Sequence, residues 1–202
     1  MTQNRPFDAV LFDMDGVLID AAPIHRRAFA TAVKVAADRS LEEVDPTTLE
    51  GRPTKVKLEM LGITGSVAAQ VFAHKQMITH AAAAAYPRDE ARVDYLSAVR
   101  RAGLKTSIVT NSIGETATAF IRAAGFQGAY IIAADHPDRP RPKPAPDLYR
   151  LAARTCDVHP SRCLVFEDSP VGIEAARAAG CVVWPTTFET LPSHLDCLLR
   201  LL

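Results

Sequence analysis

Two carboxylates, Asp13 and Asp15, lie one residue apart at the end of an apolar run and are followed by Gly16. A short apolar run predicts a buried strand, and the glycine predicts a turn after it. Side chains alternate along a strand, so we expect both carboxylates on the same side of its tip. Two nearby carboxylates repel each other unless a proton or a cation lies between them, and their oxygens suit Mg²⁺. With such an ion bound, one carboxylate is free to attack an electrophile; a solvated turn is the alternative interpretation.

Further polar residues are predicted at the ends of other strands. Thr110 and Asn111 come at the end of one apolar run, Glu167 and Asp168 at the end of another, and Lys143 lies in the proline-rich segment between them. In an open parallel sheet, ligands bind outside the carboxyl ends of the strands. A nucleophile, further carboxylates, hydroxyl and amide donors and a lysine at one edge would bind a divalent metal and a phosphate side by side.

The elements that must position these residues alternate between strand and helix. Short apolar runs, most of them bounded by turn residues and rich in Val or Ile, predict strands at 9–13, 106–110, 129–133, 163–167 and 181–184. Helices are predicted at 115–124, 146–155 and 170–179. The strands lack polar alternation, which is typical of a parallel sheet buried on both faces. The pattern predicts an α/β fold with a Rossmann-like, doubly wound parallel sheet.

One long interval, from about residue 22 to 86, breaks this alternation. It contains no convincing strand, and its composition predicts helices at 23–37, 53–61 and 66–85. We interpret it as a small all-helical cap inserted after the first strand. The expected division is a core of residues 1–20 and 88–202 and a cap of residues 21–87.

Composition excludes several function classes. The chain has 202 residues and a formal net charge of zero, which argues against nucleic acid as a main partner. No segment has the apolar length of a membrane span, and the first residues lack the apolar core of a signal peptide. The four cysteines show no Cys-x-x-Cys spacing, so reduced thiols are expected rather than a zinc site or a redox pair. We therefore expect a cytoplasmic protein with no membrane partner, either a monomer or a weak homodimer.

The motifs resemble those of the haloacid dehalogenase superfamily, in its branch of phosphatases and β-phosphoglucomutase-like enzymes with a helical cap. Four superfamily motifs occur in order, namely Asp13-Met14-Asp15-Gly16, Thr110, Lys143 and Glu167-Asp168. Residues 166–176 are very similar to the superfamily's fourth motif. One departure is Pro142, which stands before the lysine where the superfamily often has glycine.

For the acidic residues, the resemblance implies covalent catalysis assisted by Mg²⁺. Asp13 is expected to attack phosphorus and form an aspartyl-phosphate. Asp15 is expected to protonate the leaving oxygen and then to deprotonate the attacking water. The expected metal ligands are Asp13, the backbone carbonyl of Asp15, Asp168 and, directly or through water, Glu167.

The resemblance also implies how the phosphoryl group is bound. Thr110 and Asn111 are expected to donate hydrogen bonds to it, and Lys143 to neutralise its charge while holding Asp13 ionised. Each has a structural alternative, because Thr110 could simply end a strand and Lys143 could be a solvated loop charge.

The cap offers three candidate substrate residues by the same resemblance. His25 matches a histidine near the acid–base aspartate, Arg52 lies in a segment similar to the substrate-facing cap loop, and Lys75 lies where related caps carry a lysine that reaches the active site. Surface positions without function remain open for all three. Ala21 stands where many relatives have a hydroxyl residue that helps to seat a sugar phosphate in phosphomutases, which weighs against a mutase.

The expected function is therefore a Mg²⁺-dependent phosphatase of a small phosphorylated metabolite, such as a sugar phosphate or phosphoglycolate. A β-phosphoglucomutase-like sugar-phosphate mutase is the alternative enzyme. A catalytically silent binding or regulatory module on the same fold is the non-enzymatic alternative, which the presence of both Asp13 and Asp15 disfavours.

Overall fold

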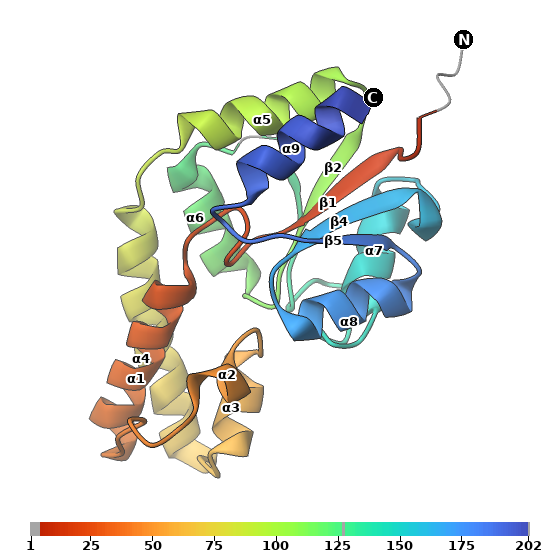
Figure 1. Cartoon of the computed structure of the whole chain (residues 1–202). Coiled ribbons are helices and arrows are strands. Elements are labelled where there is room, and N and C mark those ends of the chain that lie inside the picture. The colour runs from red at the N-terminus through yellow and green to blue at the C-terminus, as the bar shows by residue number, and fades with distance from the viewer. Residues whose placement is uncertain (1–4, 127, 202) are drawn as a thin grey trace.

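The computed structural model of the chain describes residues 5–126 and 128–201, apart from the side chains of residues 46 and 47. The strands are β1 (Ala9–Asp13), β2 (Lys105–Val109), β3 (Tyr130–Ile132), β4 (Cys163–Glu167) and β5 (Val182–Pro185). The helices are α1 (Ala22–Ala37), α2 (Pro46–Leu49), α3 (Thr54–Met60), α4 (Gly65–Ala84), α5 (Glu90–Arg101), α6 (Gly114–Ala124), α7 (Asp147–Thr155), α8 (Pro170–Ala179) and α9 (Leu191–Leu201), with a short 3₁₀ helix at Pro160–Arg162. Figure 1 shows their arrangement.

All neighbouring strands pair in parallel, in the order β3-β2-β1-β4-β5. The predicted doubly wound α/β core is thereby confirmed, and the predicted strands lie within one residue of the observed ones. After β1 the chain adds β2 and β3 on one side of it, then crosses back to add β4 and β5 on the other side. Such a reversal opens a crevice at the carboxyl ends of the central strands, where ligands bind.

Strand alternation directs the first carboxylate toward one particular layer of helices. Val10 and Phe12 of β1 belong to the apolar core that the sheet forms with α5, α6 and α9. Ala9 and Leu11 belong to the second core, on the α7 and α8 side. Asp13 is the next residue in that second series, so its side chain emerges on the α7 side of the sheet.

The same alternation places a second carboxylate beside the first. Residues 9–12 of β1 pair with residues 163–166 of β4. Cys163 and Val165 belong to the α7 and α8 core, so Glu167 continues their series toward the same side. Asp13 and Glu167 are consequently neighbours on adjacent strands, and both are buried. Two buried carboxylates this close require a cation or a proton between them.

Helices α1–α4, which we call the cap helices, come between β1 and α5 and lie together below the sheet in the view of Figure 1. Long helices α1 and α4 pack along each other. Phe29 and Val33 of α1, Leu58 of α3 and Val71 of α4 contribute to a small apolar core of their own. The sequence did not predict short α2, nor helices α5 and α9 of the sheet layer.

The two connections between the cap helices and the sheet layer meet beside α6. The backbone N–H of Asp20 donates a hydrogen bond of 2.9 Å to the Tyr86 hydroxyl and so links the two connections. The rings of Tyr86 and His25 both approach Phe120 of α6 edge-on, with centroid distances of 5.5 and 5.8 Å. Phe120 is fully buried and therefore anchors both connections to the core.

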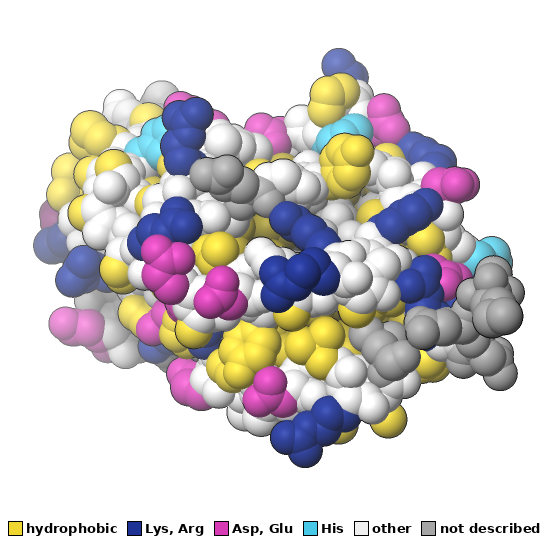
Figure 2. All heavy atoms as spheres, turned by 90° about the horizontal axis from the view of Figure 1, so that it is seen from above, with side chains coloured by type: hydrophobic (Ala, Val, Ile, Leu, Met, Phe, Trp, Pro, Cys, Tyr) yellow, Lys and Arg dark blue, Asp and Glu magenta, His cyan; other side chains and the backbone are white. Residues whose placement is uncertain are grey.

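Figure 2 shows the face formed by α5 and α9, on the far side of the sheet layer from the cap helices. Basic, acidic and apolar side chains are interspersed on this face. Within the described part of the chain, no helix combines the length and the apolar character needed to cross a membrane. The four cysteines are free thiols, as the sequence predicts.

Replacing Phe120 with alanine should lower the free energy of unfolding by about 3–5 kcal/mol, because it leaves a cavity at a fully buried aromatic position. Urea unfolding measures the change. Phe120→Leu keeps most of the side-chain volume and should cost clearly less than Phe120→Ala. A loss below about 1 kcal/mol for the alanine variant would contradict the anchoring role.

Candidate active site

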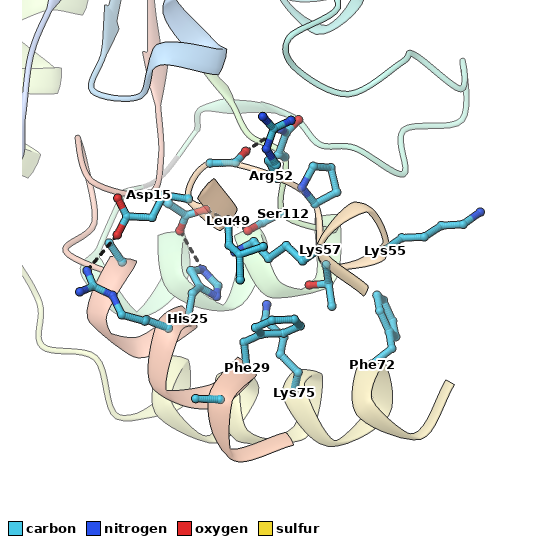
Figure 3. A pocket seen from close by; sticks show the side chains of 18 of the residues that line it. Asp15, His25, Phe29, Leu49, Arg52, Lys55, Lys57, Phe72, Lys75 and Ser112 are labelled. Atoms are coloured by element: carbon cyan, nitrogen blue, oxygen red, sulfur yellow. Dashed lines mark hydrogen bonds and ion pairs between the residues drawn. The ribbon is translucent and has the colours of Figure 1, made fainter. Parts of the chain in front are cut away.

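Most of the polar residues singled out in the sequence gather where β1, β2 and β4 end. They border a cavity of about 1110 Å³, and its lining includes Asp13, Asp15, Thr110, Lys143 and Asp168 from the core. Cap helices α1, α3 and α4 close the other side of the cavity (Figure 3). The cavity therefore lies between the sheet edge and the cap helices.

At the base of this cavity, the ammonium group of Lys143 lies between two carboxylates. Its Nζ contacts Asp13 Oδ1, lies 2.7 Å from Glu167 Oε2 and donates to the Val109 carbonyl at 2.9 Å. Lys143 is 3% exposed, so water contributes little to its solvation. Burial alone would lower its pKa, but the two carboxylates outweigh burial and raise it, so the group stays charged.

Glu167 has protein donors on both of its oxygens. Oε2 accepts from Lys143 and from the Tyr149 hydroxyl at 2.6 Å, and Oε1 accepts from the backbone N–H and hydroxyl of Ser169 at 3.1 and 2.8 Å. A carboxylate oxygen accepts about two hydrogen bonds, so these donors fill the capacity of the group. Gly172 makes room for it, since a Cβ there would lie 2.0 Å from Glu167 Oε2. These contacts favour a positioning role for Glu167 over direct metal coordination.

An oxygen from each of Asp13, Glu167 and Asp168 lies within 4.8 Å of the others. Burial and the charge of Glu167 raise the pKa of Asp13 well above its ordinary value. The same two causes raise the pKa of Asp168 to about 7. One lysine is too little positive charge for three clustered carboxylates, so a hard divalent cation such as Mg²⁺ fits this donor set.

Gly16 allows Asp168 to approach the turn that follows β1. The residue has a φ of +97°, and a Cβ there would lie 2.1 Å from Asp168 Oδ2. Any other residue would be strained in this conformation and would collide with the carboxylate. Gly16 therefore keeps Asp168 close to the end of β1.

Asp15 has a different set of partners from Asp13. Its Oδ1 lies 3.0 Å from His25 Nε2 of α1, and its Oδ2 accepts from Thr110 at 3.2 Å and Ser112 at 2.9 Å. Burial alone would raise the pKa of Asp15. The His25 ring, the Ser112 hydroxyl and the charge of Lys75 outweigh burial and lower it to about 2. Asp15 is therefore an ionised carboxylate joined to a cap histidine.

The two residues expected to bind phosphate after β2 are engaged within the protein. The Thr110 hydroxyl donates to Asp15 and accepts from the Ser112 N–H at 2.9 Å. The Asn111 amide donates to the carbonyls of Gly51 and Lys143 at 2.9 and 3.2 Å, and its Oδ1 accepts from the Lys143 N–H at 2.9 Å. Asn111 therefore joins the loop at residues 50–53 between α2 and α3, which we call the cap loop, to the loop that carries Lys143.

The cap loop also contacts the core closely at Gly51. A Cβ on Gly51 would lie 2.7 Å from the Val171 side chain of α8, and the residue has a φ of +70°. A larger residue at this position would hold the loop away from the sheet edge.

The three cap candidates all line the cavity but differ in their contacts. His25 Nε2 lies 3.0 Å from Asp15 Oδ1, Lys75 is buried, and Arg52 of the cap loop donates from Nε to the Thr48 carbonyl of α2 at 3.1 Å. Sequence reasoning missed Lys57 of α3, which also lines the cavity. It missed Tyr149 as well, for which the only signal is a hydroxyl-bearing residue on the buried face of α7.

The profile of a protein family described as haloacid dehalogenase-like hydrolase matches residues 7–180, most of the chain. The chain belongs to this family. The superfamily resemblance of the sequence motifs is thereby confirmed.

This haloacid dehalogenase-like hydrolase is similar to several named proteins. Protein CbbY of Cereibacter sphaeroides is 30% identical over 195 residues, which span 88% of the chain and 84% of the relative. Fructose-1-phosphate phosphatase YqaB of Escherichia coli is 29% identical over 189 residues, spanning 86% and 93%. The crystal structure of CbbY from Rhodobacter sphaeroides in complex with phosphate is 28% identical, with a TM-score of 0.73 over 90% of this chain and 88% of that one.

Replacing Lys143 of this hydrolase with methionine should lower the free energy of unfolding at pH 8, without metal, by about 3–5 kcal/mol. Without the ammonium, Asp13 and Glu167 face each other buried, and their folded-state pKa values rise above the unfolded values. Stability gained by such raised groups is present at low pH and is lost as the pH rises. The deficit relative to wild type should therefore shrink from pH 8 to pH 5, as urea unfolding measures.

Lys105→Met is the matched control, because Lys105 is an exposed lysine at the other end of β2. Its removal should change stability by less than about 1 kcal/mol at both pH values. An equal deficit at pH 5 and pH 8 for Lys143→Met would contradict the buried charge cluster.

Proposed function

We propose that this hydrolase is a Mg²⁺-dependent phosphatase that cleaves a small phosphorylated carbohydrate through an aspartyl-phosphate. Relatives named as phosphatases support the class of phosphoric monoester hydrolase. The observation that carries the proposal is the contact of the Lys143 ammonium group with Asp13, at the base of a cavity of about 1110 Å³, which has room for a small ester.

Asp13 is the proposed nucleophile. One of its carboxylate oxygens attacks phosphorus, a bond forms between that oxygen and phosphorus, and the bond from phosphorus to the alcohol oxygen breaks. Lys143 lowers the pKa of the carboxylate against burial and the charge of Glu167, a bound Mg²⁺ would lower it further, and the ammonium lies where it also offsets negative charge on the phosphoryl group. Glu167 and the Val109 carbonyl hold the ammonium in place.

Asp15 and His25 are proposed to move the proton. A proton reaches Asp15 across its hydrogen bond with His25, and Asp15 passes it to the leaving alcohol oxygen, which leaves Asp15 ionised again. In the second half of the proposed reaction, a water molecule attacks the phosphorus of the aspartyl-phosphate, and Asp15 takes a proton from that water. The bond between phosphorus and Asp13 then breaks, which releases phosphate and regenerates the carboxylate. Thr110 and Ser112 hold the carboxylate of Asp15 in position through both steps.

Asp13 and Asp168 are the side chains proposed to hold Mg²⁺, together with the backbone carbonyl of Asp15. Bound there, the ion would neutralise the clustered carboxylates and the charge of the phosphoryl group. Glu167 acts on the ion only indirectly in this proposal, because its hydrogen-bonding capacity is already filled by Lys143, Tyr149 and Ser169.

Residues 21–87 are proposed to act as a cap that closes over the bound substrate and excludes bulk water. The hydrogen bond from Asn111 to the Gly51 carbonyl and the one that Asp15 accepts from His25 both join cap to core, and both would break on opening. Hydrolysis is proposed over sugar-phosphate mutation because Ala21 carries no hydroxyl. Phosphate release from a panel of phosphorylated carbohydrates with Mg²⁺, against isomerisation of β-glucose 1-phosphate, tests this choice.

Asp13→Asn should abolish turnover without loss of the fold, because an amide does not form the acyl phosphate at a useful rate. Asp15→Asn retains the nucleophile and should lose about 10²–10⁴-fold in kcat, least with a good leaving group such as p-nitrophenol. Asp94→Asn, on the exposed side of α5, is the control and should be as active as wild type. Substantial turnover by Asp13→Asn, with deamidation excluded by mass spectrometry, would refute covalent catalysis.

Asp168→Ala should weaken Mg²⁺ binding by at least about tenfold and raise the Mg²⁺ concentration needed for half-maximal activity. Calorimetric titration with Mg²⁺ measures the binding independently of turnover. If the variant binds Mg²⁺ as tightly as wild type, Asp168 is not a metal ligand.

A further inference from the structure

Two lysines from different cap helices reach into the same part of the cavity. Lys57 comes from α3 and Lys75 from α4, and Figure 3 shows both side chains directed inward beside the ring of Phe29. Lys75 is 7% exposed and Lys57 is half-buried. Lys55, two residues before Lys57, also borders the cavity, but its side chain extends away from Phe29 and Lys75 in the same view and is exposed.

Neither of these two ammonium groups has a carboxylate partner among the described residues. Lys75 donates to the side-chain carbonyl of the adjacent Gln76 at 3.2 Å. The Nζ atom of Lys57 lies 5.6 Å from the centroid of the Phe29 ring, a cation–π contact. Buried charges in proteins are ordinarily paired, because an unpaired one loses hydration without compensation.

The nearby carboxylates are already engaged elsewhere. Asp15 is paired with His25 at 3.0 Å, and Glu50 with Arg26 at 3.2 Å. Burial lowers the pKa of Lys57, and burial together with the charge of Lys57 lowers the pKa of Lys75 to about 8, since the attraction of Asp15 offsets it only in part. Lys75 is therefore mostly charged at neutral pH, and burial disfavours the charge of both lysines.

The proposed transferred phosphate does not account for these two charges. Its own negative charge is met at the base of the cavity by Lys143, which contacts Asp13. Lys57 and Lys75 belong to the cap side, on α3 and α4. Two uncompensated cations there match a second negative group on the same ligand.

We propose that Lys57 and Lys75 bind a second anionic group of the substrate, either a carboxylate or another phosphate, at the cap end of the cavity. The preferred substrate is then a small phosphate ester that carries a further anion, rather than a neutral sugar monophosphate. The inference rests on the proposed phosphatase function and adds the substrate class to it. Phe29 supports the arrangement by presenting its ring face to Lys57.

Matched pairs of substrates test the inference. Fructose 1,6-bisphosphate against fructose 1-phosphate probes a second phosphate, and 2-phosphoglycolate against ethyl phosphate probes a carboxylate. Wild type should show a kcat/KM at least about tenfold higher for the doubly anionic member of one pair, since a charge-assisted contact contributes about 1.5–3 kcal/mol. The pair that shows the preference identifies the anion.

Lys57→Met keeps the length of the side chain and removes its charge. This change should lower the preference within that pair by at least about tenfold, chiefly through KM, whereas Lys55→Met should leave the preference as in wild type. Lys57→Arg should restore part of it. A ratio that Lys57→Met leaves unchanged, or no preference in either pair, would overturn the inference.

Binding to a variant that does not turn over separates this inference from the proposed function. Calorimetry on Asp13→Asn, with and without Lys57→Met, should show tighter binding of the doubly anionic compound, and loss of that advantage with the second change. If wild type releases no phosphate from any probe, including p-nitrophenyl phosphate, the phosphatase proposal fails on its own. The same binding comparison then still supports the anion site if the advantage appears, and refutes it if it does not.

Lys75→Met provides a readout that does not depend on a ligand. An unpaired buried ammonium destabilises the free protein, and its lowered pKa means that this penalty is present below pH 8 and is relieved as the pH rises toward the unfolded-state value. The variant should therefore unfold at a higher temperature than wild type at pH 7, with a smaller difference at pH 9.5. A lower unfolding temperature at pH 7 would show that Lys75 is stabilised within the protein, contrary to the inference.

Discussion

The ammonium group of Lys143, buried between Asp13 and Glu167, is the interaction on which the rest of the site depends. The register of β1 and β4 makes the two carboxylates neighbours, and strand alternation sends both to the α7 side. With this register the two carboxylates repel each other unless a cation or a proton lies between them. The loop before α7 supplies the cation, and Tyr149 and Ser169 complete the hydrogen bonding of Glu167. One positive charge still leaves the carboxylate cluster negative, which is the physical reason to expect a divalent ion.

A second set of contacts joins this charge cluster to the cap. The Asn111 side chain hydrogen-bonds to the backbone of Lys143 and also to the carbonyl of Gly51 in the cap loop. Asp15, two residues after the nucleophile, is joined to His25 on the first cap helix. The position of the cap therefore affects Lys143, which contacts the proposed nucleophile, and Asp15, the proposed proton donor. Opening the cap would expose Asp15 to water and remove the neighbour that lowers its pKa most.

The sequence predicted the strands and the motif residues well because both have local signals. Apolar runs ended by Asp13 and Glu167 mark strand tips, and Ser169 before a proline marks the start of α8, where its hydroxyl accepts from the Gly172 N–H. Helix α5 was missed, although Asp89 caps it, because the charged residues at its start resemble a loop, and α9 was missed as well. Lys57 could not be identified either. Its importance comes from the approach of α3 to Phe29 of α1, a contact between distant segments that no spacing within the sequence records.

The hydrogen bonds of the site separate groups that hold the protein together from groups that face a ligand. Glu167 and Asn111 have their bonding capacity met by protein atoms, so they fix the geometry of the nucleophile and of the cap loop. Lys57 and Lys75 have no anionic partner among the described residues, and this condition is costly unless a ligand ends it. In the proposed function, the hydrogen-bonded base of the cavity carries out the phosphoryl transfer, and the unpaired cations under the cap select the substrate. Under that proposal, changes at Lys57 or Lys75 would therefore alter what is hydrolysed without disturbing how it is hydrolysed, whereas a change at His25 of the same cap would reach the proton transfer itself.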